Sequence, residues 1–444
     1  MNAPGILERG LAVVLLILST GAFLNLSMQR GKFYLDPNAG LPYMQIIWSL
    51  LYLCVLYFLI SQTPGFWRTL LMGWPFLLFL LITVLSIIWS DAKGLTARRS
   101  LALVPTTFTG FYFASRYPFK EQLKLLLTVS KFCVVFSLIF GALHLGTAVD
   151  SLLGPAYGVF VRRDQVGSLT FLTDFLGLPA IFGMWNEPWY GIFIQRNTLG
   201  VIMALATFVF FLWSRMEPEE KWSGYLWASL SFLLIVLSGS LTGFLGLLVF
   251  AGGWKLLQTI RRHQQEARRI FLASVVLAGL GIYYFAGRPE SVASFFDRDV
   301  TLTGRTTIWG ASLVMGMDHP WIGHGFNAFW LGDEGPSGEV RRIAGWDVPS
   351  GHNGFLDIWL DLGITGLAVF LVGFVLHFWE SIRYFLSAEG SEVAWPVLFL
   401  AFLAFINLGQ SSLVAPNFFF WILYVVVSFR LSTATGKPAT DGAA

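Results

Sequence analysis

Charge is scarce in this chain. Only 12% of its 444 residues are Asp, Glu, Lys or Arg, and 55% are hydrophobic, with a mean hydropathy of +0.66. Soluble domains carry about 25% charged residues, so the composition excludes an ordinary soluble fold. Aromatic residues make up 16%, including 18 Trp and 42 Phe, which is typical of broad lipid contact and interfacial aromatic belts. The sequence therefore predicts an integral membrane protein.

Net charge and cysteine are also scarce. A formal net charge of +3 gives no basis for nucleic-acid binding. The two cysteines, Cys54 and Cys133, both lie inside apolar runs, so we interpret them as lipid-embedded thiols and not as a disulfide or a metal site. Arg9 precedes the first apolar run, and no convincing small-residue cleavage site follows that run. We therefore expect a first spanning helix and not a removed signal peptide.

Several chemical signatures are missing as well. The sequence contains no zinc signature, P-loop, dinucleotide fingerprint or nucleophile elbow. It also shows no obvious cluster of external carboxylates for a divalent metal. We therefore expect no cofactor and no metal, and any chemistry on phosphate groups would depend on arginine.

Long apolar runs dominate what is present. A spanning helix needs about 20 mostly apolar residues, and helices are the only plausible structure for runs this continuous in lipid. The prediction is an all-α polytopic membrane protein with about twelve spans. A single transmembrane domain would cover residues 1–431, followed by a disordered tail at 432–444. The two runs around Ser238-Gly239-Ser240 are either two helices or one broken element. The expected spans lie at about 11–27, 43–61, 69–90, 100–115, 124–146, 197–214, 223–238, 241–257, 270–286, 361–379, 394–410 and 416–431.

Lys and Arg in the short loops predict the orientation. With the N-terminus in the cytoplasm, most of them fall inside, and the cluster from Arg261 to Arg269 dominates this bias. Both termini are then cytoplasmic. The two long polar loops, at about 147–196 and 287–353, share the external face. Two loops on one face can build one site.

Arg196 stands where the first long loop meets an apolar run. It is either a snorkelling interfacial anchor or an anion ligand, because an arginine at a helix start adds its donors to the free backbone N–H groups there. Asn197 follows it as a candidate supporting residue. Phosphate is the natural partner for such a group.

Arg305 lies in Thr303-Gly304-Arg305-Thr306, ahead of an apolar-periodic stretch that reaches Met317. The pattern predicts a capped amphipathic helix in the loop, with Arg305 in its first turn and Trp309 in its second. The helix dipole disfavours a cation at that end. The arginine is therefore either a surface charge or the partner of something negative nearby.

His352, flanked by Gly351 and Asn353, stands at the boundary between loop and membrane, and histidine is the common general base near neutral pH. It is either structural or catalytic. His324, in Gly323-His324-Gly325, is a weaker candidate, for which we favour packing in a tight turn.

Two pairs of charges complete the candidates. Asp357 and Asp361 lie four residues apart, so they share one helix face. They would orient His352, contact sugar hydroxyls, or be solvated at the helix N-terminus. Arg341 and Arg342 we expect on a solvated face.

Four short motifs stand in and after the second long loop: Thr303-Gly304-Arg305-Thr306-Thr307-Ile308-Trp309, Pro320-Trp321-Ile322-Gly323-His324-Gly325-Phe326, His352-Asn353-Gly354-Phe355-Leu356 and Leu362-Gly363-Ile364-Thr365-Gly366-Leu367. Together they closely resemble the O-antigen ligase/polymerase superfamily. This superfamily includes lipopolysaccharide O-antigen ligases, Wzy-type polymerases and ExoQ-like exopolysaccharide polymerases. The hydropathy layout agrees along the whole chain.

The resemblance implies a metal-independent, inverting glycosyltransferase of GT-C-like architecture in the bacterial inner membrane, with its active site on the periplasmic face. The donor would be a glycan on undecaprenyl diphosphate, and the acceptor a glycan or lipid A-core. His352 would be the base on the acceptor hydroxyl, and Arg305 and Arg196 would hold the diphosphate. Asn197, Asn353, Asp357, Trp309 and His324 would support them. A chain-length regulator is a candidate partner.

Segments 325–330 and 345–349 have an ExoQ-like character that slightly favours a polymerase over an O-antigen ligase. A flippase for lipid-linked oligosaccharides is the alternative from another class. It should show internal hydropathy repeats and midplane charges, and the sequence has few of the latter.

Overall fold

The computed structural model describes residues 4–23, 42–63, 65–142, 188–262 and 304–435. Every regular element in these ranges is a helix. The chain divides into two compact units, one of residues 1–22, 27–129 and 308–444, the other of residues 23–26 and 130–307.

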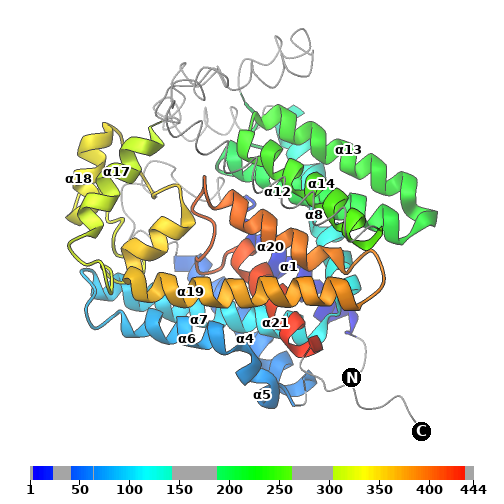
Figure 1. Ribbon diagram of the computed structural model, residues 1–444, viewed down its shortest axis with the longest axis horizontal. Coiled ribbons are helices and arrows are strands. Elements are labelled where there is room, and N and C mark those ends of the chain that lie inside the picture. The colour runs from blue at the N-terminus through cyan, green and yellow to red at the C-terminus, as the bar shows by residue number, and fades with distance from the viewer. Residues whose placement is uncertain (1–3, 24–41, 64, 143–187, 263–303, 436–444) are drawn as a thin grey trace. The chain divides into compact units, whose positions relative to one another are not determined.

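The first unit holds most of the helices (Figure 1). Its members are α1 (Ile6–Ser19), α4 (Pro42–Gln62), α5 (Phe66–Thr69), α6 (Trp74–Leu85), α7 (Lys93–Arg116), the first half of α8 (Phe119–Ala142), nearly all of α17 (Arg305–Gly316), α18 (Gly335–Ala344), α19 (Gly354–Ser387), α20 (Ala394–Ile406) and α21 (Phe419–Thr435). The helices α7 and α21 approach closely, because a Cβ on Gly110 would lie 2.5 Å from Cβ of Val425. Trp421 also donates a hydrogen bond to Thr107 across this contact, at 3.0 Å. Small residues permit such close packing between membrane helices.

The second unit is a bundle of α12 (Arg196–Met216), α13 (Lys221–Ser238) and α14 (Leu241–Arg262), with the second half of α8. The helix α12 packs against both of its partners. Gly200 and Gly243 bring α12 and α14 into backbone contact, since a Cβ on Gly243 would lie 2.5 Å from the carbonyl carbon of Gly200. Gly239, with φ +58°, ends α13 in the left-handed conformation. The two runs around Ser238-Gly239-Ser240 are therefore two helices.

Seven helices of the described ranges are long and apolar enough to span a membrane, and two shorter helices, α20 and α21, are also apolar. The prediction of an all-α polytopic membrane protein is confirmed. The expected span at 270–286 lies outside the described residues. The helix α21 continues to Thr435, so the first residues of the expected disordered tail are helical. Ser432 explains this, because its hydroxyl donates to Glu380 of α19 at 2.8 Å.

A break in α19 shapes the region around the candidate site. The backbone of Gly363 has φ +65° and ψ −169°, so α19 consists of two helices joined at a kink. The neighbouring loop at 320–325 repairs the interrupted hydrogen bonds. His324 N–H donates to Leu360 O at 3.0 Å, and Ile364 N–H donates to Pro320 O at 2.8 Å. Irregular backbone at membrane depth persists only where protein satisfies it, and this loop does so.

Candidate functional site

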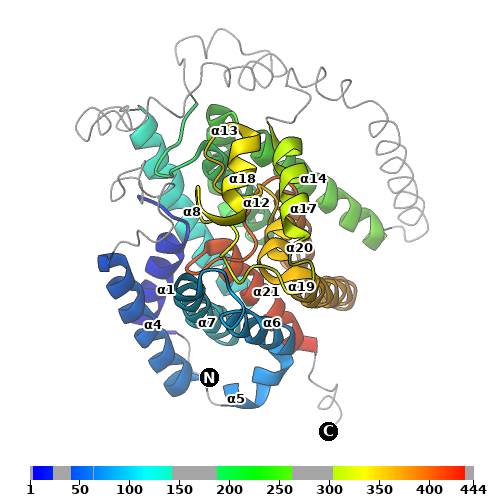
Figure 2. The ribbon, with the colours of Figure 1, turned by 90° about the vertical axis from the view of Figure 1, so that its left-hand side faces the viewer.

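The described part of the second polar loop folds into a small core of its own. The helices α17 and α18 stand next to each other beside the first turns of α19 (Figure 2). The helix from Arg305 confirms the one that the sequence predicted there. The core is a buried cluster of Ile308, Ala311, Phe329, Val340, Val348, Trp359 and Leu360. This cluster joins the polar loop to the start of a long apolar helix.

His352 lies in the tight connection that leads into α19. Its backbone has φ +48°, in the left-handed region that few residues other than glycine adopt. Such strained positions persist where the surroundings hold them, and they cluster at active sites. The side chain of Asn353 caps α19 by accepting from the N–H groups of Phe355 and Leu356, at 3.1 and 3.2 Å. The position of His352 is therefore tied to the start of the helix.

Gly351, the residue before His352, is held from two sides. Trp309 of α17 donates its indole N–H to Gly351 O at 2.8 Å. Asp357 Oδ1 accepts from Gly351 N–H at 2.9 Å and from the indole N–H of Trp330 at 2.9 Å. The structure thus brings His352, Asn353, Asp357 and Trp309 together, four residues that the sequence singled out.

The His352 ring stacks on Trp346, with ring centroids 6.1 Å apart and planes inclined by 26°. Its side chain is half-buried. A braced backbone and an aromatic neighbour restrict where the imidazole can point, which is what a general base requires.

Asp357 and Asp361 both line a cavity of about 40 Å³, as their four-residue spacing predicts. That volume holds water but no sugar ring. Asp361 is only 7% exposed, and its Oδ1 is buried without a hydrogen-bond partner among the described residues. Three roles were considered for this pair of aspartates. The contacts of Asp357 fit one of them, orientation of the His352 loop. Solvation at a helix end is wrong for Asp361.

Arg99 is a residue of this region that the sequence did not single out. Its guanidinium donates to the backbone O and the side-chain Oδ1 of Asn327, at 3.2 and 3.3 Å. Burial lowers the pKa of Arg99 to about 10, and the carboxylate of Asp361 acts in the opposite direction. In the sequence, Arg99 was recognisable only as a cation next to an expected span. Cations at such positions also set the orientation of a protein in the membrane, so this signal did not mark it as a site residue.

Arg305 is the first residue of α17, as predicted, and it is half-buried. Burial lowers the pKa of its guanidinium. Within the described ranges no carboxylate pairs with it. Both desolvation and the helix dipole disfavour an uncompensated positive charge at a helix N-terminus. The binding of an anion beside Arg305 would therefore be favourable.

Arg196 is the first residue of α12, and Asn197 follows it in the first turn. Both belong to the second unit. No side-chain oxygen caps this helix at Gln195. Arg196 therefore stands in the first turn of α12, as the sequence predicted, and its role as an anion ligand stays a prediction.

Two further expectations have clear outcomes. His324 is 3% exposed and packs in the turn, with its ring 5.2 Å from that of Phe329, so tight-turn packing is confirmed. Arg341 was expected on a solvated face, and this is wrong. Its guanidinium is buried, donates to Val348 O at 3.1 Å and pairs with Asp333 at 3.3 Å, so it closes the end of α18. Arg342 is exposed and pairs with Glu339.

Together, these helices and the site at the head of α19 define a polytopic helical membrane protein with a polar site beside a kinked span. Residues 226–371 match the O-antigen ligase family, Wzy_C. The chain is also 21% identical over 376 residues to the exopolysaccharide production protein ExoQ of Rhizobium meliloti (strain 1021), which covers 81% of this chain and 75% of that protein. The chain is thus similar to the O-antigen ligase family over residues 226–371 and to an exopolysaccharide production protein over most of its length. The family match includes Arg305, Trp309 and His352, whereas Arg196 lies outside it.

Proposed function

We propose that this protein is a membrane glycosyltransferase that transfers a glycan from a polyprenyl diphosphate, of the undecaprenyl type, to a hydroxyl of an acceptor sugar. The similarity to the O-antigen ligase family and to an exopolysaccharide production protein supports the coarser role, a polysaccharide polymerase or ligase in a membrane. The observation that carries the finer proposal is the bracing of the His352 loop by Trp309, Asn353 and Asp357.

In the proposed reaction the acceptor hydroxyl oxygen attacks the anomeric carbon of the donor. His352 takes the hydroxyl proton, a new C–O bond forms, and the bond from the anomeric carbon to the diphosphate oxygen breaks. The diphosphate leaves with the bonding electron pair. Attack from the opposite side to the leaving group inverts the anomeric centre. General-base assistance of this kind contributes about 10²–10⁴-fold in rate.

The leaving diphosphate needs positive charge to stabilise it. We assign this role to Arg305 and Arg196, each of which begins a helix. Guanidinium groups bind phosphate oxygens through two donors at once. The half-buried, unpaired state of Arg305 in the described ranges supports this assignment, since the substrate would supply the missing negative charge. Fixed cations would then do the work that a metal ion does in other transferases.

A polymerase is favoured over an O-antigen ligase by the likeness to an exopolysaccharide production protein. In a polymerase the acceptor is another lipid-linked repeat, whereas in a ligase it is lipid A-core. Deletion of the gene separates the two. Loss of polymer length with single repeats remaining indicates a polymerase, whereas accumulation of lipid-linked polymer indicates a ligase.

Turnover by the purified protein tests the reaction itself. Protein in detergent receives a lipid-diphosphate-linked glycan and an acceptor, and the release of polyprenyl diphosphate is measured. Release that depends on His352 supports the proposal. Transbilayer movement of the donor in vesicles, without release, would instead identify a flippase and overturn the proposal.

A further inference from the structure

The helix α17 carries apolar side chains on two faces. Ile308 lies on the inner face, in the buried cluster described above. Leu313, Val314 and Met317 lie on the opposite face and are exposed, Val314 to 64% and Met317 to 63%. Residues 306–317 contain no charged side chain. A helix that is apolar on most of its sides is normally covered by protein or by lipid, and exposed apolar patches mark interaction surfaces.

This apolar surface continues into the connection that follows α17. Trp321 is 68% exposed, and Ile322 beside it is also exposed. The backbone carbonyl of Trp321 accepts from Thr365 N–H at 3.1 Å, and that of Ile322 accepts from the indole N–H of Trp89 at 2.9 Å. The exposed side chains therefore stand where the connection is bound to α19, just after its kink, and to the segment that follows α6.

Exposed apolar stripes on two spanning helices lead up to the same place. Both α6 and α19 lie in segments that are long and apolar enough to cross a membrane. Their exposed apolar residues include Leu81, Leu85 and Ile88 in and after α6, and Ile364, Val372 and Val375 in α19. On a spanning helix, side chains of this kind face the hydrocarbon of the bilayer. Because Ile364 N–H donates to Pro320 O at 2.8 Å, the exposed surface of α17 and its connection extends a lipid-facing surface.

The helix α17 has the direction that a helix at a membrane surface needs. Figure 1 and Figure 2 both show it running across the axis of α19. Because α19 crosses the bilayer, a helix that lies across its end runs along the bilayer surface. Helices of this kind sink an apolar face into the boundary between headgroups and acyl chains. Tryptophan is enriched at that boundary, and both Trp89 and Trp321 stand at this end of the spans.

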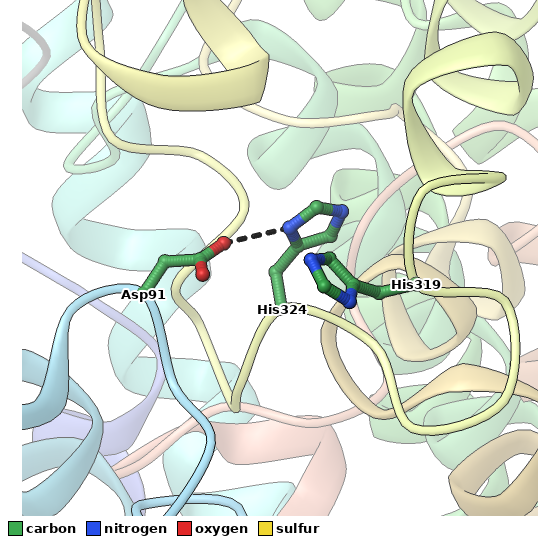
Figure 3. Close-up of side chains that lie close together, drawn as sticks. All are labelled: Asp91, His319 and His324. Atoms are coloured by element: carbon green, nitrogen blue, oxygen red, sulfur yellow. Dashed lines mark hydrogen bonds and ion pairs between the residues drawn. The ribbon is translucent and has the colours of Figure 1, made fainter.

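The connection that carries Trp321 is braced from the other side. Asp91 N–H donates to His324 O at 3.0 Å, and Asp91 Oδ2 pairs with His324 Nδ1 at 2.7 Å. Figure 3 shows this pair with the ring of His319 beside it. These contacts tie the turn after α17 to the connection between α6 and α7. Trp321 is therefore exposed because a fixed backbone presents it.

We propose that Leu313, Val314, Met317, Trp321 and Ile322 form a membrane-docking surface, which lies in the interfacial layer of the bilayer that the spans cross. The occupant of this surface is bilayer lipid. Its continuity with the lipid-facing stripes of α6 and α19 carries the proposal, and the uncharged sequence of α17 after its first residue supports it. Lipid removes these side chains from water, which stabilises the docked position of α17.

Docking sets the position of α17 relative to the membrane. Trp309 of α17 donates to Gly351 O at 2.8 Å, so the His352 loop is held at the same level. A lipid-linked glycan presents its diphosphate at the bilayer surface, because its chain stays in the hydrocarbon. This consequence rests on the transfer reaction proposed above, whereas the docking surface itself does not.

The test measures what surrounds this surface in a membrane. It uses the full chain with Cys54→Ala and Cys133→Ala, reconstituted into vesicles of phosphatidylethanolamine and phosphatidylglycerol. One cysteine is then introduced at a time, by Val314→Cys or Met317→Cys, and is modified with a nitroxide spin label. Both positions are exposed, so the label should not disturb the fold. Size-exclusion chromatography of each labelled variant checks this.

Two exposed positions serve as matched controls. Val375→Cys lies on the apolar stripe of α19 and reports lipid, whereas Arg342→Cys lies on α18 and reports water. Electron paramagnetic resonance measures the collisions of each label with oxygen, which concentrates in lipid, and with a nickel chelate, which stays in water. We expect the ratio of oxygen to nickel collisions at Val314 and Met317 to exceed that at Arg342 severalfold and to approach that at Val375.

Two outcomes would overturn the proposal. A collision ratio at Val314 and Met317 equal to that at Arg342 would place the surface in water. Few collisions with either reagent would mean that protein, such as a second copy of the chain, covers the surface. The measurement needs no substrate, so a failure of the proposed transfer reaction would leave its outcome unaffected.

Discussion

Asp357 accepts a hydrogen bond from the backbone N–H of Gly351, 2.9 Å away, and thereby sets the conformation of the residue that follows, His352. The same oxygen also accepts from Trp330. A carboxylate on the first turn of a spanning helix thus shapes the loop that precedes it. This relationship makes Asp357 a positioning residue for the proposed base.

Replacement of the base should have the largest effect. His352→Ala should lower the transfer rate by about 10²–10⁴-fold, because the proposed reaction then loses its general base. Membrane insertion should be retained, since the side chain is only half-buried. Product formation in detergent measures the rate, and size-exclusion chromatography checks folding. A transfer rate at the wild-type level would rule out the proposed role.

Replacement of the positioning residue should act through His352. Asp357→Ala removes the acceptor of the Gly351 and Trp330 N–H groups, and a displacement of about 1 Å at the reacting group can cost about 10²-fold in rate. We expect the loss in kcat with KM nearly unchanged. Asp333→Asn, whose carboxylate is exposed and pairs with Arg341, is the control and should keep its activity. A loss confined to expression level would show a merely structural role.

Replacement of Gly363 should destabilise the fold. The residue has φ +65°, and a Cβ there would lie 2.2 Å from the carbonyl carbon of Trp321. Gly363→Ala should therefore lower the free energy of unfolding by more than about 2 kcal/mol. Gly310→Ala in α17 meets open space, and better helix propensity should make it neutral or stabilising by up to about 1 kcal/mol. Thermal unfolding in detergent compares the two variants.

Glu8 and Arg116 form a buried ion pair between α1 and α7, with 2.6 Å between Oε1 and Nε, and Tyr112 donates to the same oxygen. Glu8→Gln leaves a buried guanidinium without its counter-charge, which should cost about 3 kcal/mol. Glu121→Gln breaks a partly exposed pair with Lys124 and should cost less than about 1 kcal/mol. Chemical unfolding measures both. Equal losses in the free energy of unfolding for the two variants would mean that burial of the Glu8–Arg116 pair adds nothing to its contribution to stability.

The same pair predicts a dependence on pH. Burial alone raises the pKa of Glu8, but the hydrogen bonds from Arg116 and Tyr112 hold that pKa below its ordinary value of 4.5. Because the pKa of Glu8 is lowered in the folded state, the ionised carboxylate stabilises the folded state at pH values above the ordinary pKa. This stabilisation is lost as the pH falls through the lowered pKa. Unfolding temperatures recorded between neutral pH and pH 3 should therefore fall more steeply for wild type than for Glu8→Gln. Parallel curves would contradict the assignment.

Local features of the fold and site could be predicted because local sequence causes them. Runs of about 20 apolar residues are long enough to span lipid, and the described helices follow them. The loop-to-membrane boundaries place Arg196 and Arg305 at helix starts, where the structure has them. Spacing by four residues puts Asp357 and Asp361 on one face, and both line one cavity.

Contacts between distant segments could not be predicted in this way, because hydropathy and periodicity report only on neighbours along the chain. The burial of Arg341 and the pairing of Glu8 with Arg116 depend on which helices pack together. The sequence predicted a solvated face for Arg341, counted Arg116 only toward the orientation of the chain, and gave no prediction for Glu8. Arg99 shows the same limit, since its partner Asn327 lies 228 residues further on.

The sequence alone determined that this chain is a helical membrane protein that resembles the O-antigen ligase superfamily, with His352 and two arginines as its candidate chemistry. Only the tertiary structure decided how the His352 loop is braced, where α19 breaks, and that Asp91 meets two histidines more than two hundred residues away. The physical reason is that hydrophobic length acts locally, whereas polar groups in a membrane protein must find partners wherever the fold brings them.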